Sequence, residues 1–386
     1  MIKLRRKCLH LWVPELFCFR GGIQVYLTFL LETIQNSQTN SKHHIFLKND
    51  SCLNSDFAFL PNSQFYFSGN WSLPLRTAAF TAQIMRQALW QRPNLIICAH
   101  LNFSIAAYWL KRLVGIPYWV TVYGIESWNV SRPPLQQALH NADRILSISS
   151  YTRDRLIKEQ NLDPNKISLL PCTFEANQFK ISPKPAYLLE QYGFKPDQPI
   201  ILTVSRLSAV EQYKGYDKIL EALPQIRQTI PNVHYIIAGK GDDRPRIEQL
   251  IAQLGLQDCV TLAGFVPDEQ LGDYYNLCDL FAMPSKCEGF GIVYLEALAC
   301  GKPTLGGNRD GAIDALCHGE LGALVDPDDV GAITQTIIQI LQKTYPNSLL
   351  YNPEALRQRV IDVYGFERFQ QTLAQYIDEF FASPTL

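Results

Sequence analysis

Short apolar runs alternate with longer helix-like segments along this chain, and the alternation occurs twice. Parallel strands buried on both faces appear as nearly continuous apolar runs, whereas strands of a half-exposed antiparallel sheet alternate apolar and polar residues. Parallel strands also need helical crossovers between them. The pattern therefore predicts an α/β chain with two doubly wound, Rossmann-like parallel sheets, each covered by helices on both faces.

The expected strands are residues 9–13, 45–47, 64–67, 95–99, 118–122, 144–149 and 166–169 in the first half, and 200–205, 233–238, 260–263, 280–283, 303–305 and 323–325 in the second. The expected helices are residues 23–34, 104–114, 151–160, 216–229, 243–254, 268–276, 292–299, 330–342 and 366–381.

The length of 386 residues is too great for one ordinary domain. We expect an N-terminal domain over residues 1–180 and a C-terminal domain over residues 200–365. Between them, residues 181–199 contain four prolines and several charges, which is typical of a linker. Residues 366–386 are expected to form an amphipathic helix that packs back on the N-terminal domain. Two such domains would face one another across a cleft, where ligands bind beyond the carboxyl ends of the strands.

The charge is divided unevenly between the two halves. Residues 1–180 hold 19 Lys/Arg against 10 Asp/Glu, and residues 181–386 hold 16 against 26. The basic half suggests contact with an anionic acceptor or a membrane surface, although ordinary solvated faces would give the same count. The ten cysteines show no zinc-like spacing and fit a reducing cytoplasm. Pro14 and Glu15 interrupt the apolar run near the N-terminus, so this run indicates a first strand rather than a signal peptide, and no transmembrane helix is expected.

Two carboxylates, Glu288 and Glu296, stand eight positions apart around Gly289-Phe290-Gly291. The glycines allow the backbone to approach a ligand closely. A helix that starts just after them offers free N–H groups and a positive dipole end, which suit a phosphate. The two acids are therefore predicted to bind different parts of one extended ligand, such as a nucleotide-sugar.

A pair of cations, Arg206 and Lys214, follows the expected strand at residues 200–205. Arginine binds a diphosphate through its planar fork, and lysine binds it as a point charge. Both would stabilise the negative charge that develops on a departing phosphate. Two surface cations on a loop are the alternative interpretation. The chain contains no Walker motif, no complete dinucleotide fingerprint, no Gly-x-Ser-x-Gly elbow and no nucleic-acid pattern.

At these residues the chain resembles the family 4 retaining glycosyltransferases of GT-B fold. The most specific match lies in residues 200–330: Ser205-Arg206, Lys214-Gly215, Gly239-Lys240-Gly241, Phe265-Val266, Pro284-Ser285, Glu288-Gly-Phe-Gly, Leu295-Glu296-Ala297 and Gly301-Lys-Pro. A looser match covers Gly21-Gly22, residues 142–149 and residues 169–171 with Phe179.

The resemblance implies a role for each matching residue. Glu296 would accept hydrogen bonds from the ribose hydroxyls, and Glu288 would hold hydroxyls of the donor sugar. The Gly289-Phe290-Gly291 backbone would contact the sugar and phosphates, Val266 would line the donor site, and Gly22 would allow close approach of the distal phosphate or the acceptor. Arg206 and Lys214 would bind the diphosphate, and no metal or other cofactor would be needed.

The chain departs from the family after the strand at residues 118–122. Tyr123 stands where the family often has a sugar-contacting His, and a phenol cannot provide an imidazolium charge near pH 7. His100, after the strand at residues 95–99, is a second candidate for a sugar contact, with a structural His as the alternative. Glu126 is a candidate for the acceptor side.

The resemblance thus implies a retaining, metal-independent transfer of a hexose from a nucleoside diphosphate sugar to a saccharide or lipid-linked acceptor. We therefore expect a role in polysaccharide or glycolipid synthesis in the cytoplasm, with peripheral contact at the inner face of the membrane through the basic N-terminal domain as a further possibility. Two alternatives are a nucleotide-sugar-binding module without transfer activity and a GT-B epimerase or phosphorylase.

Overall fold

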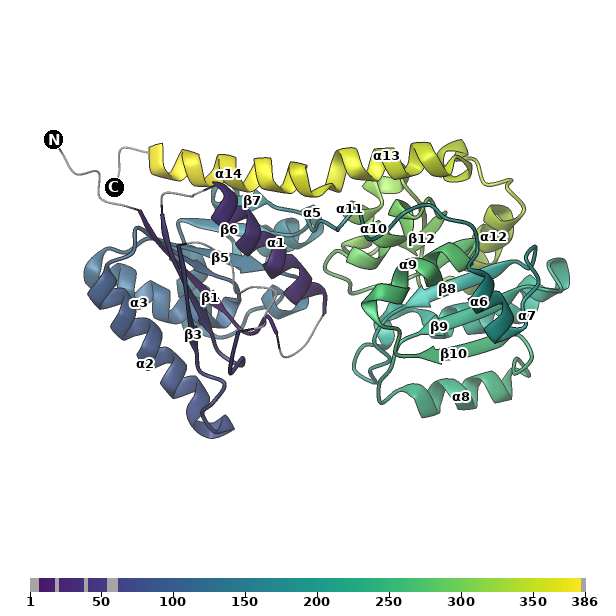
Figure 1. Cartoon of the computed structure of the whole chain (residues 1–386), viewed down its shortest axis with the longest axis horizontal. Helices are drawn as coiled ribbons and strands as arrows, with labels where there is room; N and C mark the ends of the chain where they lie inside the picture. The colour runs from purple at the N-terminus through teal and green to yellow at the C-terminus, as the bar shows by residue number, and fades with distance from the viewer. Residues whose placement is uncertain (1–6, 18–20, 38–40, 54–61, 383–386) are drawn as a thin grey trace. The chain divides into compact units, whose positions relative to one another are not determined.

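The computed structural model describes residues 7–17, 21–37, 41–53 and 62–382. The chain folds into two compact α/β units (Figure 1). Unit 1 comprises Met1–Cys172 together with Phe369–Leu386, and unit 2 comprises Thr173–Arg368. The chain thus crosses from unit 1 to unit 2 and returns to unit 1 at its C-terminal end.

Unit 1 contains a seven-stranded parallel sheet with the order β3-β2-β1-β4-β5-β6-β7. Its strands are β1 (Cys8–Val13), β2 (Lys42–Leu47), β3 (Ser63–Phe67), β4 (Leu95–Cys98), β5 (Tyr118–Val122), β6 (Arg144–Ser147) and β7 (Ile167–Leu169). Its helices are α1 (Gly22–Ser37), α2 (Leu73–Gln91), α3 (Ser104–Val114), α4 (Pro133–Asn141) and α5 (Ser150–Gln160).

Unit 2 contains a six-stranded parallel sheet with the order β10-β9-β8-β11-β12-β13. Its strands are β8 (Ile200–Val204), β9 (His234–Ala238), β10 (Val260–Gly264), β11 (Leu280–Met283), β12 (Thr304–Gly307) and β13 (Ala323–Val325). Its helices are α6 (Ala186–Tyr192), α7 (Tyr216–Thr229), α8 (Arg244–Gln253), α9 (Asp268–Leu277), α10 (Ile292–Ala299), α11 (Ala312–Ala315), α12 (Val330–Leu341) and α13 (Pro353–Tyr364).

Each sheet has its own hydrophobic core. All five residues of β5 and all five of β9 are buried, as expected for strands with helices on both faces. In unit 1 the core includes Trp12 and Phe46, and in unit 2 it includes Tyr216 and Tyr235. The predicted α/β class with two doubly wound parallel sheets is confirmed.

Helix α14 (Phe366–Ala382) returns to unit 1, as the amphipathic pattern predicts. Its Tyr376 hydroxyl donates to the carbonyl of Leu169 at 2.9 Å, and Glu379 pairs with Arg144 at 3.2 Å. The Arg144 guanidinium also lies 4.6 Å from the centre of the Tyr376 ring, which adds a cation–π contact.

The expected linker at residues 181–199 differs from the structure, because this segment belongs to unit 2 and contains α6. Pro185 is the N-cap of this helix, so the proline begins an element instead of breaking one. Leu188 is buried, and Lys184 pairs with Asp279 at 2.7 Å. Within the described residues, no helix has the length and apolar character needed to cross a membrane.

Candidate functional site

Glu288 and Lys214 meet at the carboxyl ends of two neighbouring strands of unit 2. Lys214 follows β8 and Glu288 follows β11, which pair in the sheet. The Lys214 ammonium is ion-paired with Glu288 Oε2, and only 15% and 17% of the two side chains are exposed. Burial alone would lower the pKa of Lys214, but the adjacent Glu288 carboxylate raises it above its ordinary value. A fixed cation and a carboxylate are thus held together in a mostly desolvated position.

The two loops that bear this pair are tied together through their backbones. The N–H of Lys286 donates to the carbonyl of Tyr213 at 3.0 Å. Gly215 adopts φ +79°, and a Cβ there would lie 2.2 Å from the Pro284 carbonyl oxygen. Glycine is therefore required both for the backbone conformation and for the close approach of the loops.

Asp310, which the sequence analysis did not single out, organises the Glu288 loop. This fully buried residue follows β12. Its Oδ2 accepts hydrogen bonds from the Ser285 hydroxyl and the Glu288 N–H, both at 2.7 Å, and its Oδ1 accepts from the Ala312 N–H at 2.9 Å. Burial raises the pKa of the Asp310 carboxyl to about 6 although these donors favour the charged form. A polar residue directly before Gly311 at the carboxyl end of a parallel strand was the available signal.

Asp310→Asn should remove a pH-dependent component of stability. Between about pH 4 and pH 6, the folded protein keeps a proton that the unfolded chain has already released, so stability falls as the pH rises. The predicted shift corresponds to about 3 kcal/mol at most, and the asparagine variant should lack this decline. Urea unfolding at pH 4, 5, 6 and 7 would measure how the free energy of unfolding changes with pH. Asp197→Asn, at an exposed position, is the control. The same change with pH in the unchanged protein and in both variants would contradict the assignment of this pH dependence to Asp310.

Arg206 lies apart from the buried pair. Its side chain is 63% exposed and forms an ion pair with Glu211.

Tyr213, a second residue that the sequence analysis missed, is influenced by both the Lys214–Glu288 pair and the Arg206–Glu211 pair. The Lys214 ammonium lies 5.3 Å from the centre of its ring. Burial raises the pKa of Tyr213 to about 12, and Lys214, Glu211, Glu288 and Arg206 all act on it electrostatically. Both predicted cations thus influence one phenol, with Lys214 buried beside its ring and Arg206 at the surface.

Glu296 lies on the second turn of α10, as predicted, and is half-buried. The Tyr275 hydroxyl donates to its Oε2 at 2.6 Å, which orients the carboxylate. The helix begins after Gly291, whose φ is +92°, and a Cβ at Gly291 would lie 2.5 Å from the Tyr294 ring. Phe290 is buried against Tyr364, so Gly289, Phe290 and Gly291 can reach a ligand only through their backbone.

The remaining predicted donor residues are Val266 and Gly22. Val266 follows β10 and is only 7% exposed, so its side chain belongs to the protein interior. Its neighbour Phe265 is exposed, with the Lys240 ammonium 4.7 Å from the centre of its ring. Gly22 is the exposed first residue of α1 in unit 1.

Tyr123, His100 and Glu126 all make local structural contacts in unit 1. The hydroxyl of Tyr123, a candidate for a sugar contact, donates to the carbonyl of Ala99 at 3.1 Å, and the side chain is buried. His100 Nδ1 accepts from the Asn102 N–H at 3.1 Å and caps a short 3₁₀ turn, which agrees with the structural alternative. Glu126 Oε1 accepts from the Tyr123 N–H at 2.5 Å. A position at the end of a strand therefore does not by itself distinguish a side chain that contacts a ligand from one that hydrogen-bonds a backbone group of the protein.

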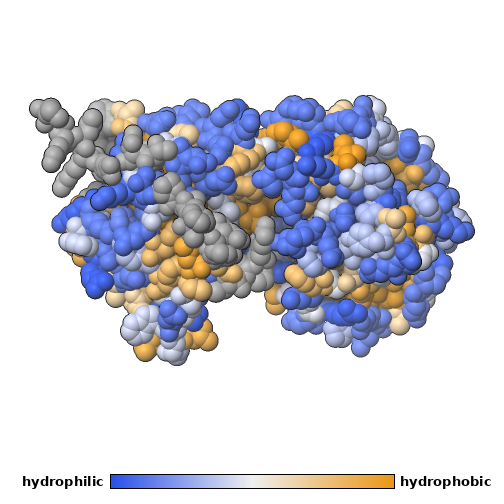
Figure 2. Space-filling model, viewed as in Figure 1, coloured by the Kyte–Doolittle hydropathy of each residue, from blue (hydrophilic) through white to orange (hydrophobic). Residues whose placement is uncertain are grey.

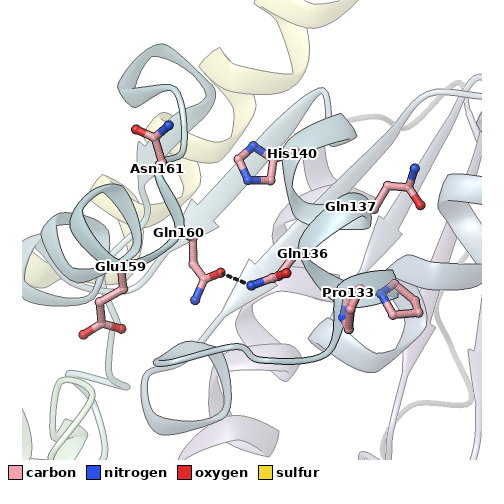
Figure 3. Close-up of a pocket in the computed structure, with 8 residues that line it drawn as sticks. Pro133, Gln136, Gln137, His140, Glu159, Gln160 and Asn161 are labelled. Carbon is pink, nitrogen blue, oxygen red and sulfur yellow. Dashed lines mark hydrogen bonds between the residues drawn. The ribbon is translucent and has the colours of Figure 1, made fainter.

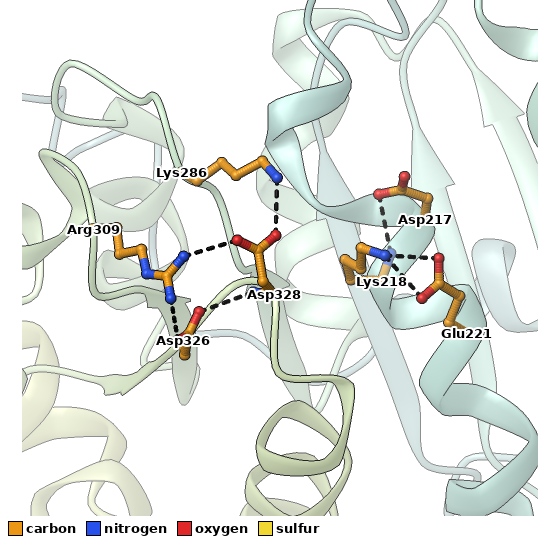
Figure 4. Close-up of polar contacts among 7 residues, drawn as sticks. All are labelled: Asp217, Lys218, Glu221, Lys286, Arg309, Asp326 and Asp328. Atoms are coloured by element: carbon orange, nitrogen blue, oxygen red, sulfur yellow. Dashed lines mark hydrogen bonds and ion pairs between the residues drawn. The ribbon is translucent and has the colours of Figure 1, made fainter.

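A network of surface ion pairs holds the loops after β11, β12 and β13 together (Figure 4). Asp328 accepts from Lys286 at 2.9 Å and from Arg309 at 2.8 Å, and Arg309 also pairs with Asp326. Single exposed pairs contribute little to stability, but several charges joined in one network contribute more. Lys286 and Arg309 are close neighbours in sequence of Glu288 and Asp310, so the network supports the segments that bear those carboxylates.

An open cavity of about 580 Å³ lies between α4 and α5 of unit 1 (Figure 3). It is lined by Pro133, Pro134, Gln136, Gln137, His140, Glu159, Gln160 and Asn161. The side chains of Gln136 and Gln160 approach each other across it. The cavity contains none of the residues predicted to bind a ligand.

Known proteins resemble both halves of the chain. The family model Glycosyltransferase Family 4 matches residues 21–178, and the model Glycosyl transferases group 1 matches residues 188–358. The chain is 33% identical over 221 residues to a GDP-mannose-dependent alpha-(1-6)-phosphatidylinositol monomannoside mannosyltransferase of Mycolicibacterium smegmatis, covering 55% of this chain and 56% of that protein. A D-inositol 3-phosphate glycosyltransferase of the same organism is 29% identical over 297 residues, covering 70% of this chain and 65% of that protein. The matches thus span less than two thirds of these relatives.

Solved structures agree on the fold. HepE from Anabaena, crystallised with UDP and glucose, superposes with a TM-score of 0.77 at 19% identity, over 96% of this chain and 99% of that one. Sucrose-phosphate synthase from Thermosynechococcus elongatus gives 0.78 at 22% identity, over 98% and 100%. Together with the two family models and the paired parallel sheets, these likenesses identify the chain as a member of the family 4, group 1 glycosyltransferases, with the GT-B fold.

Proposed function

We propose that the protein transfers a hexose from a nucleoside diphosphate sugar to a saccharide or lipid-linked acceptor, with retention of anomeric configuration and without a metal ion. The buried pair of Lys214 and Glu288 is the observation that most supports this proposal. It offers a fixed cation for a diphosphate beside a carboxylate for sugar hydroxyls, within one small volume at the carboxyl ends of β8 and β11.

The donor would be bound by groups from three parts of unit 2. Glu296, oriented by Tyr275, would accept two hydrogen bonds from the ribose. Lys214 and Arg206 would bind the diphosphate, with the first N–H groups of α10 as further donors. Arg206 would have to exchange Glu211 for the phosphate, which its exposed position allows. These protein cations supply the charge that a metal ion would otherwise supply.

The chemistry would proceed on one face of the sugar. The bond from the anomeric carbon to the diphosphate oxygen breaks while the acceptor hydroxyl forms the new bond from the same side, through an oxocarbenium-like state. The departing phosphate oxygen takes the acceptor proton, so no separate protein base is required. Lys214 would stabilise the charge that builds on the leaving diphosphate.

A thermal-shift panel of UDP-, GDP- and ADP-sugars tests the donor class. The correct donor at 100 times its dissociation constant should add about 2.7 kcal/mol of stability to the unit that binds it. Glu296→Gln should weaken this shift for every nucleotide-sugar, because the amide nitrogen repels the ribose hydroxyl donor. Arg359→Gln, which alters an exposed pair with Glu320, is a matched control. No shift with any member of the panel would contradict the proposal.

Transfer itself distinguishes the enzyme from its alternatives. Incubation of labelled donor with saccharide and lipid extracts should give a labelled product. Donor binding without transfer would favour a nucleotide-sugar-binding module. Conversion of the donor without any acceptor would favour an epimerase, and phosphate-dependent release of the sugar would favour a phosphorylase.

A further inference from the structure

Helix α2 is apolar on two opposite sides. Its inner side is buried through Phe80, Ile84 and Ala88. Its outer side is formed by residues that recur at intervals of three or four positions, as residues on one side of a helix do. These residues are Leu75, Ala78, Ala79, Ala82, Arg86, Leu89 and Trp90, and Arg86 is the only charged one among them. A surface helix ordinarily carries polar and charged residues on the side opposite the core. Here Leu75 is 55% exposed and Trp90 is 80% exposed.

Helix α3 extends this surface, since it packs beside α2. Trp109 and Leu113, on its outer side, are 52% and 67% exposed, and the exposed Arg112 lies between them. Trp71 and Leu73, where the chain enters α2, are also exposed. We name the outer sides of α2 and α3 the α2–α3 surface. In the view of Figure 2, hydrophobic residues reach the surface in the region where Figure 1 shows α2.

The charge on this part of the chain has one sign. Residues 57–125 contain no Asp or Glu and five basic residues: Arg76, Arg86, Arg92, Lys111 and Arg112. Lys111 is held by Asp143 at 2.6 Å, whereas Arg86 and Arg112 stand among the exposed Trp and Leu side chains. Tryptophan favours the membrane–water interface, and arginine beside it binds anionic headgroups.

From these observations we infer that the α2–α3 surface docks unit 1 on a membrane that contains anionic phospholipids. The apolar side chains would enter the headgroup region, and Arg86 and Arg112 would contact lipid phosphates. Charge complementarity favours this occupant over a second copy of the chain, because two copies would oppose cations to cations. This inference rests on the proposed function and narrows it. A transferase that docks on a membrane would use an acceptor of the lipid-linked class, because such acceptors are reached at the membrane.

Vesicle co-sedimentation of the full chain, without donor or acceptor, tests the inference. Binding to vesicles of phosphatidylcholine and phosphatidylglycerol should exceed binding to phosphatidylcholine alone at least tenfold, and should fall as salt rises. The triple variant Leu75→Gln, Trp90→Gln, Trp109→Gln should bind at least tenfold less. Arg86→Gln with Arg112→Gln should remove most of the preference for anionic vesicles.

A matched triple variant, Ile125→Gln, Tyr187→Gln, Val210→Gln, removes comparably exposed apolar side chains outside the α2–α3 surface and should bind like the unchanged protein. Circular dichroism checks that every variant folds. Absence of vesicle binding, or equal binding by both triple variants, would overturn the inference. So would self-association in ultracentrifugation that only the surface variant abolishes. The vesicle assay contains no donor and no acceptor, so it is independent of sugar transfer. Vesicle binding by a protein that transfers no sugar would refute the proposed function alone. Sugar transfer by a protein that binds no vesicles would refute this inference alone.

Discussion

Lys214→Ala is expected to lower kcat/KM for sugar transfer by about 10²- to 10³-fold, the usual loss when one fixed donor to a developing negative charge is removed. The ammonium is mostly buried and already paired, so it needs no reorganisation when the diphosphate leaves. Glu288→Gln should cause a comparable loss, because the amide keeps the shape but cannot hold the ammonium by charge. Transfer assays with the purified donor at saturating and limiting concentrations would separate kcat from KM.

The matched control is Lys218→Ala, four residues further along the chain. Lys218 pairs with Glu221 at 2.9 Å at the surface, and its removal should leave transfer unchanged (Figure 4). The double variant of Lys214 and Glu288 should lose much less than the product of the two single losses, since both act through one pair. Lys214→Ala should also reduce stability by about 1–3 kcal/mol, because it leaves a carboxylate without its partner. Full activity in both single variants would exclude the proposed site.

The fold was predictable from the sequence wherever burial alone determines the pattern of apolar and polar residues. The strands expected at residues 280–283 and 323–325 coincide with β11 and β13, because a strand enclosed on both faces is an apolar run that ends where the chain turns. Helix α2 was not predicted. Its outer and inner sides are both apolar, so the one-sided period that identifies an amphipathic helix is missing. Helix α13 was also missed: Pro353 occupies its first turn, where proline starts a helix rather than interrupting one.

The candidate site was predictable only as far as its motif extends. The sequence singles out Glu288, Glu296 and Lys214 as candidates because glycine-flanked acids and strand-end cations are specific in combination. Asp310 acts through three hydrogen bonds to residues of two loops, and no local pattern indicates which loop it will meet. Tyr123 is a candidate through its position after β5 alone, and that position did not indicate that its hydroxyl would donate to a carbonyl 24 residues away in the sequence.

Gly311→Ala is expected to weaken binding of the nucleotide-sugar at least tenfold. Gly311 has an ordinary φ of −66°, so the substitution introduces no backbone strain. A Cβ at this position would instead lie 2.1 Å from the Gly289 carbonyl oxygen and 2.8 Å from the Phe290 nitrogen. Both atoms are backbone and cannot rotate away. The Glu288–Gly291 loop must therefore move, and the hydrogen bond from the Gly311 N–H to the Glu288 carbonyl, now 2.8 Å, is lost.

Calorimetric titration with the donor identified by thermal shift would measure this loss, together with a fall in stability of about 1–3 kcal/mol from overpacking. Gly331→Ala is the control, because a Cβ there would approach only the flexible Asp329 carboxylate, at 3.2 Å, in a helix that alanine favours. It should bind the donor like the unchanged protein. If Gly311→Ala bound the donor equally well, the position of the Glu288–Gly291 loop would not determine donor affinity. Weaker binding in Gly311→Ala alone would instead show that contact with the loop after β12 sets the position from which Glu288 reaches the sugar.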